Sequence, residues 1–140
     1  MNSQKFHPFE DRFSRDMRNG LSSALAEAVE TGNGKMLDKL QKDFASRKLA
    51  PCYRDYLKDR SARYEKALQL IEMDQHPIQQ AVVLWNQGLF FEVHEVLEHA
   101  WYHAKGETKL TLQALIRAAG VYVKLEYGYI DAAHKIAGKS

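Results

Sequence analysis

The chain has 140 residues, of which 20 are basic and 18 acidic, and a net charge of +2. This length is that of one ordinary domain, and the balanced, interleaved charges give no electrostatic reason to expect nucleic acid or a membrane surface as a partner. Cys52 is the only cysteine, which excludes an intramolecular disulfide and a cysteine-based zinc cluster. Residues 1–16 lack the apolar stretch of a signal peptide, and no run approaches the roughly 18 apolar residues of a spanning helix. We therefore expect a cytoplasmic protein.

Apolar residues recur with a helical period through the first half of the chain. A first helix is predicted around residues 13–29, and it ends at the glycine-rich residues 31–34. A shorter helix follows, with Met36, Leu37, Leu40 and Phe44 on one side. Pro51 is placed where a first-turn proline is tolerated and begins a long predicted helix that extends to about residue 71.

The second half contains four more predicted elements, each bounded by a proline or a glycine. Pro77 follows a break in the chain, and the helix after it runs to Asn86. The later helices are predicted at about residues 90–104, at about 109–127 and beyond Gly128. No stretch alternates as a strand would, so the pattern predicts an all-α fold.

A faint internal repeat links two of these turns. Seven residues beginning at Gly88 resemble the seven that begin forty positions later at Gly128: they read Gly88-x-Phe90-x-x-Val93-His94 and Gly128-x-Ile130-x-x-Ala133-His134. Repeated helical hairpins indicate a tetratricopeptide-like stack, and a small bundle would give the same pattern.

We therefore predict a single-domain array or bundle of about six or seven helices, built from antiparallel hairpins. Residues 1–75 are expected to form a helical N-terminal extension that packs on a core made by residues 76–140. The chain stops at Ser140, only a few residues into the return helix of the last hairpin. Because so short a helix covers little of its neighbour, we expect either a truncated chain or a partner chain that completes the core.

One segment, residues 90–104, combines apolar residues with histidines and glutamates. At 100° per residue, His94 and Glu98 lie about 40° apart on one helix face. The same face carries Phe90, Phe91, Leu97 and Trp101, whereas Glu92, His99 and His103 are expected on the opposite side. A second apolar strip consists of Val93, Val96, Ala100 and Ala104, so the helix is expected to be buried on two sides. This places His94 and Glu98 within the core, where each polar group needs a partner.

Three interpretations of this pair remain open. His94 and Glu98 can form a buried structural network that fixes the register of the hairpin, with Arg117 pairing with Glu95 or Glu98. They can instead be acid/base groups beside a small pocket, with the carboxylate orienting the imidazole. The third interpretation is a metal site, because His and Glu at positions i and i+4 can face one ion.

The metal interpretation departs from two known patterns. Glu98 stands where the zinc-protease motif has its second histidine. The Glu-x-x-His element of di-iron bundles is missing as well, since Glu92 is followed three residues later by Glu95, and Glu95 by Glu98. A site for one ion therefore needs a third ligand besides His94 and Glu98, and the cofactor, a divalent metal or none, stays open.

These residues resemble the signature of the family called domain of unknown function 309, over about residues 78–137. The stretch that carries the resemblance reads Leu84-Trp85-Asn86-x-Gly88-x-Phe90-Phe91-Glu92-x-His94-Glu95-x-x-Glu98-x-x-Trp101, followed by Gly106 and by Leu112-Gln113-x-Leu115-Ile116. The N-terminal residues resemble a helical extension of some bacterial members. The resemblance implies a compact all-α domain and no established reaction. Its candidate functional residues here are Asn86, His94, Glu95, Glu98, Trp101 and Gln113.

Two functions follow as hypotheses. The first is a helical binding or scaffold module, in which exposed aromatic residues of the helix around Tyr53 and Tyr64, or the C-terminal hairpin, bind a protein partner or a second copy. Asn86, Trp101, Gln113 and Arg117 are its candidate binding residues. The second is a small enzyme, such as a metal-assisted hydrolase, that uses His94, Glu95 and Glu98. An enzyme is expected to keep a partly solvated pocket at His94, whereas a structural network is expected to be sealed.

Overall fold

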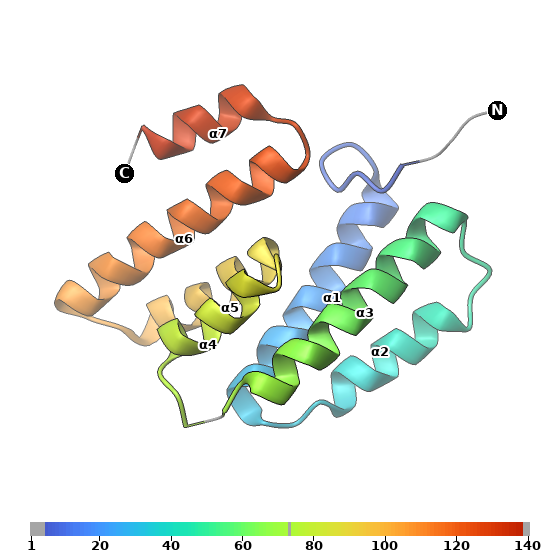
Figure 1. The fold of residues 1–140 in the computed structure, drawn as a ribbon, viewed down its shortest axis with the longest axis horizontal. Coiled ribbons are helices and arrows are strands. Elements are labelled where there is room, and N and C mark those ends of the chain that lie inside the picture. Colours follow the sequence, from blue (N-terminus) through green and yellow to red (C-terminus); the bar gives the residue numbers. More distant parts are fainter. Residues whose placement is uncertain (1–4, 73, 139–140) are drawn as a thin grey trace. The chain divides into compact units, whose positions relative to one another are not determined.

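A computed structural model describes residues 5–72 and 74–138 of the chain. Within those residues it contains seven α-helices and no strand, which confirms the predicted all-α fold of helical hairpins (Figure 1). The helices fall into two compact units, residues 1–73 and 74–140. The division lies two residues before the boundary drawn from the sequence, and the packing of the N-terminal extension on the rest of the chain stays a prediction.

The first unit contains three helices: α1 (Arg12–Thr31), α2 (Lys35–Ala45) and α3 (Pro51–Leu70). α1 ends where the sequence predicts, because Gly32 takes the left-handed conformation with φ of 73° and donates its N–H to the Ala28 carbonyl. Pro51 occupies the first turn of α3, where its missing N–H costs no helical hydrogen bond.

The core of the first unit consists of side chains spaced three or four residues apart on α1, together with residues of α3. Met17, Leu21 and Leu25 are fully buried, and so is Tyr64. On α2, the expectation that Met36 shares the buried side with Leu37 and Phe44 is wrong, since Met36 is 56% exposed. Met36 and Leu37 are adjacent, so they point about 100° apart on the helix, and α2 buries only a narrow stripe.

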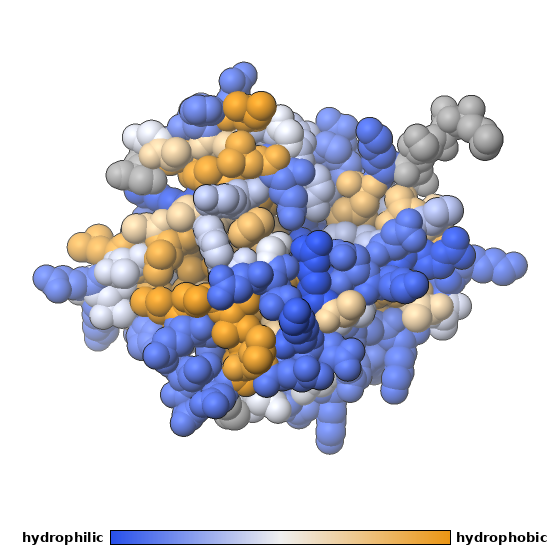
Figure 2. All heavy atoms as spheres, in the orientation of Figure 1, coloured by the Kyte–Doolittle hydropathy of each residue, from blue (hydrophilic) through white to orange (hydrophobic). Residues whose placement is uncertain are grey.

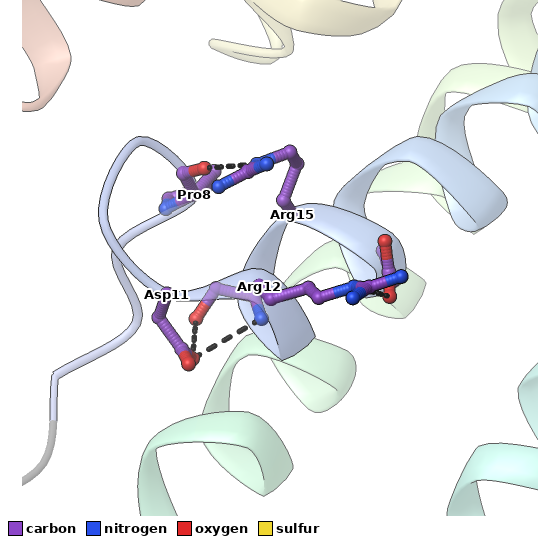
Figure 3. A network of polar contacts seen from close by, with 6 residues as sticks. Pro8, Asp11, Arg12 and Arg15 are labelled. Carbon is purple, nitrogen blue, oxygen red and sulfur yellow. Dashed lines mark hydrogen bonds and ion pairs between the residues drawn. The ribbon is translucent and has the colours of Figure 1, made fainter.

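A polar network fixes the start of α1 (Figure 3). The Asp11 carboxylate caps the helix by accepting from the Ser14 N–H and, at 2.6 Å, from the Ser14 hydroxyl. Arg15 donates from Nε to the carbonyl of Pro8, which holds the preceding loop against the first turn. The Tyr53 hydroxyl of α3 donates to the same Asp11 carboxylate at 2.6 Å. One carboxylate thereby joins the N-terminal loop, α1 and α3.

This network shifts two pKa values in opposite directions. The hydrogen bond from the Ser14 side chain, followed by that from Tyr53, lowers the pKa of Asp11. The hydrogen bond to Asp11 raises the pKa of Tyr53 to about 12. Next to it, burial raises the pKa of the Cys52 thiol, which favours the unreactive thiol form.

The tyrosines of α3 pack inside the unit. Tyr53 is 7% exposed and Tyr64 is 1% exposed, so the expectation that they mark a partner surface is wrong. Tyr56 is half-buried, with the ring of Phe6 stacked on it at 3.6 Å between centroids. The helical spacing of these residues was a packing signal, because large aromatic rings gain most from burial.

The second unit contains four helices: α4 (Pro77–Asn86), α5 (Phe90–His103), α6 (Gly106–Glu126) and α7 (Ile130–Ala137). α4 begins with a reciprocal cap. His76 accepts the Ile78 N–H at Nδ1, and Gln79 accepts the His76 N–H, while Pro77 occupies the first turn. α6 begins three residues earlier than predicted, at Gly106, whose φ of 63° turns the chain into the helix.

The sequence repeat corresponds to a repeated backbone turn. At the α4–α5 turn, Gly88 donates to the Trp85 carbonyl and Leu89 to the Leu84 carbonyl. Forty residues later, at the α6–α7 turn, Gly128 donates to the Leu125 carbonyl and Tyr129 to the Lys124 carbonyl. Both glycines have positive φ, 72° and 83°. The second unit is therefore two helical hairpins closed by the same turn.

None of the helices in the described residues is both long and apolar enough to cross a membrane.

Candidate functional site

α5 buries one of its two apolar sides in the core of the second unit, the strip of Val93 and Val96, and not the side that carries His94 and Glu98. Val93, Val96 and Leu97 are 2–6% exposed, and the Glu92 side chain is fully buried. The expectation that Glu92 points away from the core is therefore wrong. α5 is apolar around most of its circumference, so periodicity alone leaves two faces able to be buried. Packing against α4 and α6 selects the face centred near Val93 and Val96.

His94 and Glu98 consequently lie on the flank of α5 that reaches solvent. Their side chains are 32% and 38% exposed, so the expectation of a sealed pair in the core is wrong. Glu95 is half-buried beside them. The phenyl ring of Phe91 stacks nearly parallel to the His94 imidazole, with 6.1 Å between centroids and 16° between planes. The His94 imidazole thus has the Phe91 ring beside it, and both His94 and Glu98 are partly exposed to water.

The three side chains converge. His94, Glu95 and Glu98 each offer one nitrogen or oxygen atom, and these three atoms lie within 4.8 Å of one another. The Nδ1 atom of His94 is 3.3 Å from a carboxylate oxygen of Glu98. The two atoms do not form a hydrogen bond, and the buried Nδ1 of His94 has no other hydrogen-bond partner among the described residues. The third candidate ligand beside His94 and Glu98 is thus the neighbouring Glu95.

Trp101 lies one turn beyond Glu98 on α5. Its indole N–H is buried and has no hydrogen-bond acceptor in the described part of the chain. The Lys109 ammonium of α6 sits over the indole ring, 4.1 Å from its centroid, which is a favourable cation–π distance. Trp101 therefore joins the end of α5 to the start of α6, and it keeps one unused donor.

The remaining candidate residues are not brought into this cluster. Asn86 is the exposed last residue of α4, and Gln113 is half-buried on α6. Neither side chain makes a hydrogen bond or ion pair within the residues described. Arg117 lies one turn after Gln113 and is also half-buried, and its pairing with Glu95 or Glu98 stays a prediction.

A second feature, which the sequence did not reveal, is an apolar hollow of about 420 Å³ between α4, α5 and α6. Val82 and Tyr122, at its rim, are 51% and 45% exposed. Trp85 also lines it and packs edge-on against Tyr122 at 4.8 Å. Figure 2 shows hydrophobic side chains reaching the surface over the helices of the second unit. The sequence does not predict this hollow, because the apolar residues that line it have the pattern expected of core residues. Only the packing of the three helices shows the space between them.

Fold and site together define a small all-α domain of two helical hairpins that presents a histidine–carboxylate cluster on α5. Residues 78–136 match the family model described as Domain of unknown function (DUF309), which confirms the resemblance inferred from the sequence. The match covers nearly all of the four-helix second unit. No curated protein and no solved structure matches the chain.

Proposed function

We propose that the second unit is a divalent-metal-binding helical module whose ion is held by His94, Glu95 and Glu98. The observation that supports this proposal is the convergence of one imidazole nitrogen and two carboxylate oxygens within 4.8 Å. Residues at i, i+1 and i+4 of a helix span about 100° of its circumference, so three such side chains can reach one point above α5.

The distances fit one ion after the side chains close in on it. The ligands of a tetrahedral zinc ion, each about 2.1 Å from the metal, are about 3.4 Å apart, so ligand atoms that lie within 4.8 Å of one another would need to approach by roughly 1.4 Å at most. Half-exposed glutamates make that change through ordinary rotamers. The buried Nδ1 of His94, which has no hydrogen bond, would gain a partner in the ion.

The donor set favours a transition metal over calcium or magnesium. Imidazole nitrogen suits zinc, iron, copper and nickel, and the two carboxylates also suit manganese, whereas calcium and magnesium prefer sites made entirely of oxygen. Two carboxylates and a neutral imidazole give the site a net charge of about −2 before a divalent ion binds, which the ion would neutralise. Three protein ligands also leave a coordination position for water, which supports the alternative of a metal-assisted hydrolase in which the ion activates that water.

Titration calorimetry of the full chain with zinc and with manganese tests this proposal. We expect one equivalent to bind to the wild-type protein, and the affinity to fall by about 100-fold or more in His94→Ala and Glu98→Gln, since even residues that only support a metal ligand are worth about 10–100-fold. His134→Ala is the matched control, because His134 occupies the position equivalent to His94 and has Lys135 and Gly138 where His94 has Glu95 and Glu98.

The control separates the proposed site from adventitious binding. If His134→Ala weakens binding as much as His94→Ala does, or if His99→Ala/His103→Ala abolishes it, the ion sits elsewhere and the proposal fails. Circular dichroism of each variant shows whether the helices are retained. Because His94 is one-third exposed, its replacement is expected to leave the fold intact.

A second candidate function is self-association of the second unit through the hollow between α4, α5 and α6. The exposed apolar rim at Val82 and Tyr122 favours it, because exposed apolar surface around a concavity is typical of interaction sites. Sedimentation velocity over a range of concentrations tests it. Val82→Glu is expected to shift a dimer to monomer, whereas Leu110→Glu, at a 69% exposed position outside the hollow, is expected to have no effect. A wild-type protein that stays monomeric throughout would contradict this candidate.

A further inference from the structure

The first unit contains a hollow of about 450 Å³ between the C-terminal half of α2 and the N-terminal half of α3. Its apolar part is formed by Ala45, Leu49 and Leu57, of which Leu57 is 8% exposed. Gln41 of α2 donates to the Ser61 hydroxyl of α3 at 3.1 Å, and both residues line the hollow, so this hydrogen bond joins its two walls.

Cations surround this apolar floor. Lys42 of α2, Arg47 of the connection, and Arg54 and Lys58 of α3 all line the hollow, and Asp38 is the acidic residue among the lining side chains. Arg47 is already occupied, because it pairs with Asp43 at 2.7 Å and lies over the ring of Phe44.

The other three cations are available to a ligand. In the part of the chain that the structure describes, the side chains of Lys42, Arg54 and Lys58 make no hydrogen bond or ion pair. Arg54 and Lys58 are one turn apart, so they project from the same face of α3. Three positive charges thus border the hollow against the single negative charge of Asp38, and this excess of positive charge attracts an anion.

We infer that this hollow binds a small phosphate ester, with the phosphate held by Lys42, Arg54 and Lys58 and its organic part on the floor formed by Ala45, Leu49 and Leu57. A guanidinium matches phosphate geometry with two parallel hydrogen bonds, and ammonium groups add charge without that directionality. The volume lies within the range of about 300–1,000 Å³ typical of small-molecule sites.

The alternative polyanion, a nucleic acid, fits these residues less well. Backbone binding needs a stripe of cations that follows many phosphates, whereas this chain has a net charge of +2 with acidic and basic residues interleaved. A second hollow between α2 and α3 shares Asp38 with the first, and its lining among the described residues includes Glu65 and no lysine or arginine, so the positive charge does not extend along both hollows.

Phenyl phosphate and inorganic phosphate, titrated into the isotopically labelled full chain and followed by NMR, test the inference. Phenyl phosphate is expected to bind more tightly, because its ring buries apolar surface that inorganic phosphate lacks. R54Q/K58Q is expected to weaken phenyl phosphate binding by about tenfold or more, as loss of charge-assisted hydrogen bonds does. The control K35Q/K66Q makes the same change in charge at positions that do not line the hollow.

Each outcome supports or overturns the inference. Chemical shift changes concentrated in α2 and α3, lost in R54Q/K58Q and kept in K35Q/K66Q, support the site. If phenyl phosphate binding weakens equally in both double variants, the ligand is attracted by the overall charge of the protein, and the inference is overturned. So does the absence of binding at millimolar phenyl phosphate, or binding of a single-stranded oligonucleotide by a protein that ignores phenyl phosphate. All four substituted side chains are exposed, so the variants are expected to fold.

Discussion

The two hairpins of the second unit have the same turn and different chemistry. Gly88 and Gly128 close them with the same pair of backbone hydrogen bonds, and the residue five positions after each glycine, Val93 or Ala133, is 2% exposed. His94 and His134 also occupy equivalent positions. However, only the first hairpin has carboxylates one and four residues after its histidine, where the second has Lys135 and Gly138. Turn and core positions therefore build the hairpin, while the solvent-facing positions of α5 are free to carry a site.

The largest difference in stability between the two hairpins is expected for substitutions in the core. Leu84 is fully buried, and its counterpart forty residues later is Lys124. Leu84→Ala is expected to lower the free energy of unfolding by about 2–5 kcal/mol, whereas Lys124→Ala is expected to cost less than about 1 kcal/mol. Urea denaturation followed by tryptophan fluorescence measures both, because the two tryptophans, Trp85 and Trp101, lie in the second unit. If both substitutions lowered the free energy of unfolding by similar amounts, the two hairpins would be packed alike at Leu84 and Lys124, which would contradict this prediction.

Transplanting the carboxylates tests whether the second hairpin can acquire the chemistry of the first. Lys135→Glu with Gly138→Glu gives His134 the same neighbours as His94, and Gly138 has the ordinary φ of −66°, which accommodates a side chain. If helix spacing alone makes the proposed site, zinc binding by calorimetry should rise from one equivalent to two. A single equivalent would show that the wall formed by Phe91, absent from the second hairpin, is also required.

Replacing a turn glycine is expected to change the stability of the second unit by an intermediate amount. Gly128 has a φ of 83°, and a methyl group added there would meet no other atom within 4 Å. Gly128→Ala is therefore expected to cost about 1–2 kcal/mol through backbone strain alone. Gly120→Ala is the control within α6, because it also meets no neighbour but lies in a helix interior, and it is expected to stabilise the unit by about 0.5–1 kcal/mol. Urea denaturation measures the change in the free energy of unfolding for both variants. Changes of opposite sign would confirm that Gly128 is required for its backbone conformation and not for lack of space.

The last prediction concerns the first unit at alkaline pH. The hydrogen bond to Asp11 raises the pKa of Tyr53 from 10 to about 12. Its contribution is therefore complete below about pH 10, and it is lost as pH rises from about 10 through 12, because the unfolded chain ionises first. The difference in unfolding midpoint between wild type and Tyr53→Phe, followed by circular dichroism, should shrink between about pH 10 and pH 12. A difference that stays constant would contradict the assigned Asp11 contact.

The helices and turns of this protein follow from its sequence alone. Pro51 and Pro77 set two helix starts, and Gly32, Gly88 and Gly128 mark helix ends, because these residues act through local backbone geometry that requires no tertiary contact. The repeat could also be recognised from the sequence, because it consists of the same turn residues. The spacing of His94 and Glu98 also indicated correctly that their side chains meet.

Which face of α5 is buried depends on tertiary packing. The helix is apolar on two sides, so its period allowed either the face of His94 or that of Glu92 to enter the core, and packing selected Glu92. The same selection left His94, Glu95 and Glu98 converging at the surface, where an ion can reach them. The two hollows also arise from packing, because each is lined by residues from more than one helix, and no pattern within a single helix reveals an unfilled space between them.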